Sequence, residues 1–242
     1  RSLPEKGYDQ AATSLLDTLL NTVWQNGAIA HQYLKDTAEG DGFLDDYSSF
    51  GQALLEGFLL TGNSMYLERA HELAERIERV FPFEGDFRVY TPAVDAAWQK
   101  QLEIEDNVIP SANSMWAHFF QYLGVIADRN DWKEQAQLAL RAVHSKVFRY
   151  GPNFSNWLEL GLMRAYGAKE LVITGSGAKA AAEELQRAHY QPGTLVLFSE
   201  SASELAHFKG RVGHTLTYYL CSNNTCQLPT TDLNELLKLW KA

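Results

Sequence analysis

Apolar residues recur at helical spacing in three segments of the chain. Each segment opens with an aromatic residue four positions before an alanine, at Tyr8, Tyr66 and Trp132. After each opening, apolar residues follow the period of one helix face, while charged residues occupy the other positions. The three segments therefore predict a repeated amphipathic helix, near residues 8–23, 66–81 and 132–147.

Three other segments are apolar on most sides and predict buried helices. They cover about residues 45–60, 111–127 and 154–166, and Gly62 is placed to end the first of them. Alternation of outer and inner helices over residues 1–168 predicts α-hairpin repeats of an incomplete (α/α) toroid, similar to six-hairpin glycosidases. Such a toroid has two helices per hairpin and only about half of them are predicted here. We therefore expect a fragment of a larger protein, with an open solenoid-like array as the alternative.

From Lys169 onward the pattern changes to short strands and helices. Strands are predicted at 171–174, 194–198 and 215–220, and a helix at 178–188. Asp232 is expected to cap a last helix that ends near Trp240. The strand–helix–strand order implies parallel pairing of the first two strands. The expected fold class is thus mainly α, with a small α/β segment over residues 169–242.

The net charge of −9 argues against a nucleic-acid partner, because phosphate binding needs a basic face. No apolar run is long enough to span a bilayer, so no membrane partner is expected. Only two cysteines, Cys221 and Cys226, are present, which does not fit a disulfide-built secreted scaffold. A cytoplasmic location is the default. Free thiols are favoured for the two cysteines, with a disulfide as the second interpretation.

Polar residues gather where the predicted inner helices begin. An offset of 66 residues aligns Asp45–Ser48 with Ser111–Ser114, and Asp106 lies on the loop before the second group. Helix capping explains one residue in each group, but it does not explain Asp46 beside Asp45. Paired carboxyls can supply the acid and the base of sugar chemistry. The candidate catalytic residues are Asp45, Asp46 and Asp106, and the candidate substrate-binding residues are Tyr47, Asn107, Ser111, Asn113, Ser114, Trp98 and Trp116.

Each of these candidates also has a structural interpretation. The polar residues can be consumed in caps and internal hydrogen bonds, and the aromatic residues can belong to the core. The histidines are scattered, and none is assigned a catalytic role. Cys221 and Cys226, with the nearest histidines His207 and His214, match no standard zinc spacing, so no metal is expected.

The segment from Gly175 to Ala180 fits the pattern G-x-G-x-x-A between a strand and a helix. Backbone N–H groups in such a turn can bind a phosphate, which makes Gly175 and Gly177 the candidate residues for cofactor binding. No acidic residue clearly ends the next strand in the ribose position, although Glu200 is close. Because a tight turn needs glycine anyway, no cofactor is expected.

Three motifs together carry a family resemblance: Gly42–Tyr47, Asp106–Ser114 and Tyr219–Pro229. In order and approximate spacing they resemble the C-terminal part of the spermatogenesis-associated protein 20-like family. The resemblance implies a longer protein in which a thioredoxin-like domain precedes a helical toroid similar to glycosidases and N-acylglucosamine 2-epimerases. The chain has no Cys-x-x-Cys, so no redox property is carried over. It departs from the family over residues 84–101, which are more polar than usual.

Three functions follow as hypotheses. The first is binding or processing of a small carbohydrate in the toroid cavity, as in a glycoside hydrolase or sugar epimerase. The second is a non-catalytic interaction domain, whose partners are the missing N-terminal toroid and thioredoxin-like portions of the same protein. The third is nucleotide or phosphate binding at Gly175 and Gly177.

Overall fold

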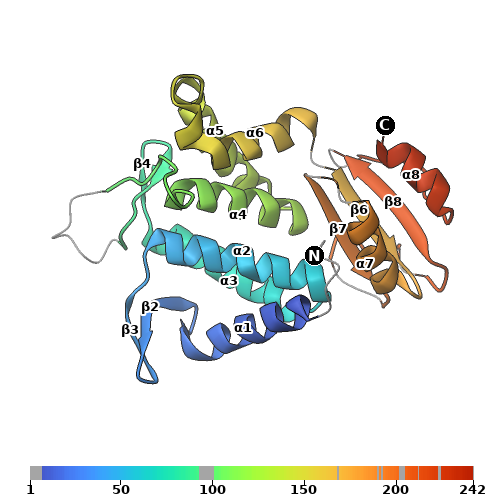
Figure 1. Ribbon diagram of the computed structural model, residues 1–242, viewed down its shortest axis with the longest axis horizontal. Helices are drawn as coiled ribbons and strands as arrows, with labels where there is room; N and C mark the ends of the chain where they lie inside the picture. The colour runs from blue at the N-terminus through green and yellow to red at the C-terminus, as the bar shows by residue number, and fades with distance from the viewer. Residues whose placement is uncertain are drawn as a thin grey trace. The chain divides into compact units, whose positions relative to one another are not determined.

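A computed structural model describes residues 7–92, 101–167, 169–189, 191, 193–201, 205–211, 213–222 and 225–241 (Figure 1). Over this part the protein is mainly α-helical with small β-sheets, as the sequence predicts. The chain divides into two compact units. The helical unit comprises Gln10–Phe58 and Asn63–Gly161, and the sheet unit is formed mainly from Leu162 onward, together with Leu59–Gly62. The division at residue 168 expected from the sequence stays a prediction.

The predicted helices are present, with bounds that differ from the expected ones by a few residues. They are α1 (Tyr8–Thr22), α2 (Leu44–Thr61), α3 (Ser64–Val80), α4 (Ala112–Ile126), α5 (Asn130–Arg149), the 3-10 turn η1 (Gly151–Phe154) and α6 (Ser155–Tyr166). Gly62 follows α2 with a φ of 73°, which a glycine adopts without strain and which ends the helix. Asn63 then begins α3, since its side chain accepts a hydrogen bond from Met65 N.

The burial of these helices separates two kinds. Nearly every position of α4 is buried, whereas α3 and α5 bury one face and expose the other. The α2 and α4 helices touch directly, because Gln52 Nε2 donates to Met115 O at 2.8 Å. A Cβ at Gly51 of α2 would lie 2.6 Å from the ring of Phe119 in α4, so this glycine permits the close approach of the two helices. These contacts fix the position of the helix starts that carry the candidate residues.

The helical unit also contains short strands that the sequence analysis did not predict. They are β1 (Trp24–Gln25), β2 (Ala28–Leu34), β3 (Thr37–Asp41), β4 (Phe83–Glu84) and β5 (Phe87–Arg88). Lys35 and Asp36 join β2 to β3 with positive φ angles of 49° and 63°. Two consecutive residues with positive φ form a turn that matches the twist of a hairpin, although neither is glycine. These strands were missed although the sequence carries a hairpin signal, because Asn26-Gly27, with φ angles of 52° and 84°, forms the two-residue turn that joins β1 to β2.

The sheet unit follows the predicted strand–helix–strand order. Its elements are β6 (Lys169–Thr174), α7 (Ala178–Ala188), β7 (Thr194–Ser199), β8 (Thr217–Ser222), β9 (Thr225–Cys226) and α8 (Leu233–Lys241). The strand order is β7-β6-β8-β9, with β6 parallel to β7 and antiparallel to β8. Alternate residues of the strands form a core with both helices, including Ile173, Val196, Leu185 and Trp240. Asp232 caps α8 as expected, since its Oδ1 accepts from Asn234 N at 2.8 Å.

The two cysteines form a disulfide, so the preference for free thiols was wrong and the second interpretation holds. Cys221 and Cys226 face each other in the register of β8 and β9. The sequence spacing gives no sign of this pairing, because the pairing depends on the register of β8 with β9.

Candidate functional site

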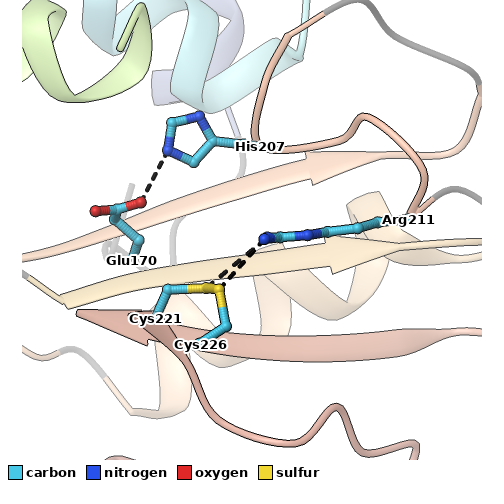
Figure 2. The surroundings of a disulfide bond; sticks show 5 residues. All are labelled: Glu170, His207, Arg211, Cys221 and Cys226. Carbon is cyan, nitrogen blue, oxygen red and sulfur yellow. Dashed lines mark hydrogen bonds and ion pairs between the residues drawn. A yellow bond between two sulfur atoms is a disulfide. The ribbon is translucent and has the colours of Figure 1, made fainter. Parts of the chain in front are cut away.

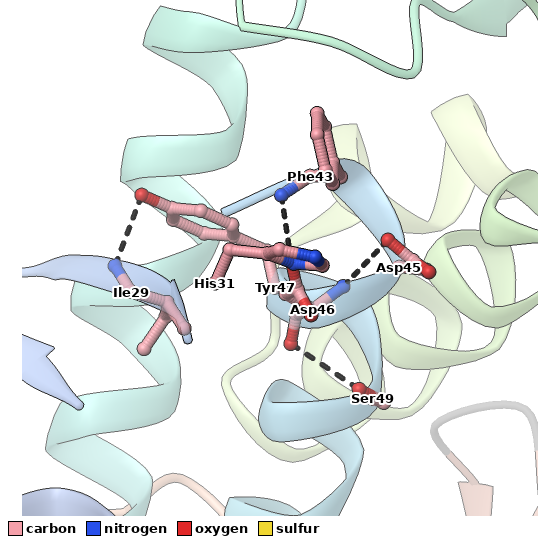
Figure 3. Close-up of polar contacts among 7 residues, drawn as sticks. All are labelled: Ile29, His31, Phe43, Asp45, Asp46, Tyr47 and Ser49. Atoms are coloured by element: carbon pink, nitrogen blue, oxygen red, sulfur yellow. Dashed lines mark hydrogen bonds and ion pairs between the residues drawn. The ribbon is translucent and has the colours of Figure 1, made fainter. Parts of the chain in front are cut away.

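The first turn of α2 brings two predicted carboxyls together with a histidine. Asp46 Oδ2 accepts a hydrogen bond from the backbone N–H of Phe43 at 2.8 Å and lies 2.7 Å from His31 Nδ1 (Figure 3). The bond to Phe43 is one half of a capping box, in which the third residue of a helix reaches back to its start. The bond to His31 joins the helix to β2. Asp46 therefore caps the helix and orients an imidazole at the same time.

Asp45 lies beside Asp46 in a different environment. Its Oδ1 accepts from the backbone N–H of Asp46 at 3.0 Å, and its carboxyl forms a hydrogen bond with the Tyr90 hydroxyl. Burial, and then the charge of Asp46, raise the pKa of Asp45 above its ordinary value. Burial, followed by the charges of Asp45 and Glu103, also raises the pKa of Tyr90. Two adjacent carboxyls in unlike environments are a known feature of acid–base sites.

A pocket of about 730 Å³ opens in front of these two pairs. His31 and Tyr90 line this pocket, and each has an aspartate as its partner: Asp46 for the His31 imidazole and Asp45 for the Tyr90 hydroxyl. Phe43 also lines the pocket and stacks on Tyr90, with ring centroids 5.1 Å apart and planes inclined by 10°. Other polar groups of the wall are those of Gln32, Glu39, Asp41 and Gln101. The pocket thus combines a flat aromatic surface with several hydrogen-bonding groups.

Asp106 occupies a buried network at the start of α4 and α6. Its Oδ1 accepts from Ser111 N and Ser114 Oγ, and its Oδ2 accepts from Asn156 N, at 2.8–2.9 Å. Ser111 caps α4, since its hydroxyl oxygen accepts from Ser114 N. Asn156 Nδ2 in turn donates to Ser114 Oγ at 2.9 Å. Asp106 and both serines are buried, and the structure gives them partners within the protein.

Asn113 lies fully inside the protein and holds the backbone of β5. Its Oδ1 accepts from Arg88 N at 2.8 Å, and its Nδ2 donates to Arg88 O and Glu103 O. Trp116, one turn further along α4, is also fully buried, and the guanidinium of Arg88 lies 5.0 Å from its ring. Arg88 itself is buried, and burial lowers its pKa to about 10. Arg88 was not predicted, because an arginine in a short strand carries no burial signal in the sequence.

The remaining predicted residues lie in three different settings. The Tyr47 hydroxyl is buried and accepts a hydrogen bond from Ile29 N at 3.1 Å. Asn107 is exposed on the loop before α4. Trp98 lies outside the described residues. His31 and Tyr90 were not predicted. Around His31, residues 28–33 do not alternate between apolar and polar positions, so they gave no strand signal.

In the sheet unit, Gly175 and Gly177 form the turn between β6 and α7. The N–H groups of Gly175, Ser176 and Ala178 already donate to backbone carbonyls. Lys179 N, in the first turn of α7, has the carboxylate of Glu200 at 3.4 Å. A Cβ at Gly175 would lie 2.3 Å from Thr215 O, so close backbone approach requires this glycine. The turn therefore has a steric reason for its glycine that involves no phosphate.

Within the described ranges, no group of three or more His, Cys, Asp or Glu side chains is arranged to hold a metal ion. A search of the same residues for a helix with the length and hydropathy of a membrane span finds none.

Comparison with known proteins supports the family resemblance. No family model matches the chain. The chain is similar to spermatogenesis-associated protein 20. It is 26% identical to the mouse (Mus musculus) protein and 26% to the human (Homo sapiens) protein, each over 212 residues, or 82% of this chain. The rat (Rattus norvegicus) protein is 25% identical over the same length. The chain spans only 27% of the length of spermatogenesis-associated protein 20.

Proposed function

We propose that the helical unit binds a small carbohydrate in the pocket formed by β2, β3 and the start of α2. The observation that carries this proposal is a pair of hydrogen bonds beside a pocket with a stacked aromatic wall: Asp46 Oδ2 accepts from His31 Nδ1, and the Asp45 carboxyl accepts from the Tyr90 hydroxyl. Sugars offer hydroxyl groups to polar side chains and C–H faces to aromatic rings. The pocket presents both kinds of surface.

The same arrangement suits acid–base chemistry on such a ligand, as in a glycosidase or sugar epimerase. Because Asp46 Oδ2 accepts a hydrogen bond from His31 Nδ1, this nitrogen carries the proton of the neutral imidazole. His31 Nε2 then has a lone pair that can accept a proton from the ligand. The Asp45 carboxyl accepts the O–H of Tyr90, which leaves the hydroxyl oxygen of Tyr90 able to accept from a ligand hydroxyl. In this proposal His31 and Tyr90 contact the ligand, and Asp45 and Asp46 position them.

The helical unit contains two α-hairpins. The hairpins α2–α3 and α4–α5, with a buried and an amphipathic helix in each, are the units from which an (α/α) toroid is built. We propose that they contribute to a toroid completed by other parts of a longer protein. The resemblance to spermatogenesis-associated protein 20, over 27% of its length, supports this arrangement.

The test is a titration of the chain with a panel of monosaccharides and amino sugars, measured by thermal shift and calorimetry. We expect one sugar class to bind, His31→Ala to abolish binding and Asp46→Asn to weaken it. His144→Ala, a change of an exposed histidine on α5, is the matched control and should bind as the unchanged protein does. Failure of every sugar to bind, or equal binding by His31→Ala, would contradict the proposal.

A non-catalytic interaction domain is the second candidate. Asp106, Ser111, Asn113 and Ser114 are all buried and hydrogen-bonded internally, as that hypothesis expects. It is tested by producing the chain together with the thioredoxin-like and toroid portions of the longer protein. A stable complex with no sugar binding would favour it over the carbohydrate proposal. Because the N–H groups at Gly175 and Ser176 have protein acceptors, nucleotide binding there is not proposed.

A further inference from the structure

The disulfide between Cys221 and Cys226 lies beside the cationic side chain of Arg211. Arg211 Nη2 is 3.3 Å from Cys226 Sγ, and Arg211 Nη1 is 3.8 Å from Cys221 Sγ (Figure 2). Sulfur in a disulfide is neutral and a weak acceptor, so it gains little from a guanidinium. A thiolate is an anion, and a neighbouring arginine stabilises it. The contact therefore favours the reduced form of the pair.

Two other ionisable groups, Glu170 and His207, belong to the same sheet unit as Cys221. Glu170 lies directly opposite Cys221 in the register of β6 and β8, and its carboxylate alone would disfavour a thiolate. His207 Nε2 lies 2.8 Å from Glu170 Oε2 and is its partner within the sheet unit. Over the described residues no carboxylate pairs with Arg211, whose guanidinium instead lies over the Tyr219 ring at 5.1 Å. The positive charge of Arg211 is thus directed at the sulfurs.

The two sulfurs differ in access. Cys221 is 3% exposed in β8, whereas Cys226 is half-buried in the outermost strand, β9. An attacking thiolate can reach Cys226 more easily, and the leaving group is then Cys221. The sequence separation of 5 also means that the bond closes a short loop. Such a loop contributes less to stability than a long one, so we expect the fold to persist after the bond is reduced.

We propose that Cys221–Cys226 is a reversible thiol–disulfide exchange site. A reductant thiolate attacks Cys226 Sγ and forms a mixed disulfide, and the bonding electrons leave on Cys221 as a thiolate beside Arg211. When the reductant is a dithiol, its second thiolate then attacks the reductant sulfur that is bonded to Cys226. This closes a disulfide within the reductant and releases Cys226 as a thiolate. The pair gains two electrons, the dithiol loses two and becomes a disulfide, and each released thiolate takes up a proton from solvent according to its pKa.

The first measurement uses the oxidised full chain without any substitution. Reduced glutathione is added, the reaction is stopped by alkylation, and peptides are analysed by mass spectrometry. We expect glutathione on Cys226 and the alkyl group on Cys221. Glutathione mainly on Cys221, or no mixed disulfide, overturns the proposal.

The second measurement is the rate of reduction by dithiothreitol. Arg211→Gln should slow it about fivefold, because the leaving thiolate loses its cation and leaves less readily. Arg211→Lys keeps a charge and should slow it less. Lys209→Gln removes an exposed charge from the same segment and is the matched control. Equal rates for Arg211→Gln and the unchanged protein overturn the proposal.

A structural crosslink is distinguished by the state of the fold after reduction. Circular dichroism of the fully reduced chain should be close to that of the oxidised chain, and removal of the reductant should restore the bond. Loss of the sheet signal on reduction would show that the bond is a structural staple, and the proposal would fail.

Discussion

The side chain of Asn113 satisfies both hydrogen-bonding groups of the Arg88 backbone. Its Oδ1 accepts from Arg88 N at 2.8 Å and its Nδ2 donates to Arg88 O at 3.0 Å. The two residues are 25 positions apart, so an amide on α4 replaces the partner strand that β5 lacks on this side. A side chain that imitates a strand must be an amide, because only an amide offers a donor and an acceptor at this spacing.

Asn113→Ala should therefore be strongly destabilising. It removes three hydrogen bonds and leaves buried backbone groups without partners, which we expect to lower the free energy of unfolding by about 2–4 kcal/mol. The measurement is urea unfolding followed by circular dichroism. Asn107→Ala, on the exposed loop, is the control and should change the stability by less than about 0.5 kcal/mol. Similar values for the two variants would show that the contact is energetically unimportant.

Arg88 provides a second test of the same region. Its guanidinium donates to Phe81 O and Gln135 Oε1 at 2.7 Å and lies 4.2 Å from the Phe83 ring. Arg88→Met keeps an unbranched apolar stem but loses the guanidinium and these contacts, and should cost about 2–4 kcal/mol. Arg79→Met, on the exposed face of α3, removes an equal charge and should cost no more than about 0.5 kcal/mol. A near-neutral Arg88→Met would mean that apolar packing fully replaces the buried cation.

Asp45 leads to a prediction about pH. Its folded-state pKa is raised by burial and by Asp46, so the folded protein binds this proton more tightly than the unfolded chain does. The ionised carboxyl consequently lowers stability once the pH rises through the folded pKa, and has no such effect below the ordinary value of 3.8. Asp45→Asn should stabilise the protein at neutral pH by less than about 1 kcal/mol, because the site is partly solvated.

This gain should disappear at a pH below the ordinary aspartate value. Unfolding by urea at both pH values measures it, and the exposed Asp41→Asn is the control. A gain that is the same at both pH values would have a cause other than ionisation. If Asp45→Asn is stabilising yet impairs sugar binding, the carboxyl is retained for function at the expense of stability.

The two glycines of the β6–α7 turn should respond differently to alanine. Gly175→Ala places a Cβ against Thr215 O and also strains a φ of 96°, so we expect a loss of at least about 2 kcal/mol. Gly177→Ala meets no atom within 4 Å and strains only a φ of 83°, at about 1 kcal/mol. Thermal unfolding of both variants provides the measurement. An equal response would show that the approach to Thr215 is not what fixes the turn.

The helices were predictable because their periodicity depends only on local sequence. Leu73 and Ile77, for example, lie on the buried face of α3, as the apolar spacing indicates. The parallel pair of β6 and β7 followed from the order of elements. The pocket was harder to predict from the sequence. His31 and Tyr90 reach Asp46 and Asp45 only because the β2–β3 hairpin and the segment after β5 fold back onto the start of α2. Contacts between distant segments leave no periodic signal.

The placement of Asp106 was harder still to predict. The sequence shows a carboxyl on a loop before a helix, which suits catalysis and capping equally well. In the structure, the Asp106 carboxylate accepts a hydrogen bond from the backbone N–H of Asn156, which is 50 positions away. This contact gives Asp106 a structural role at the start of α6. Neither the spacing nor the residue types distinguish these alternatives, because the outcome is decided by tertiary packing.

Asp106 also gives two helices a common counter-charge. The first turns of α4 and α6 both donate N–H groups to this one carboxylate, through Ser111 and Asn156. Each helix carries a partial positive charge at its start, so a single anion interacts favourably with two macrodipoles. The electrostatic energies of α4 and α6 are therefore coupled, and loss of this one charge would weaken the beginnings of both helices together.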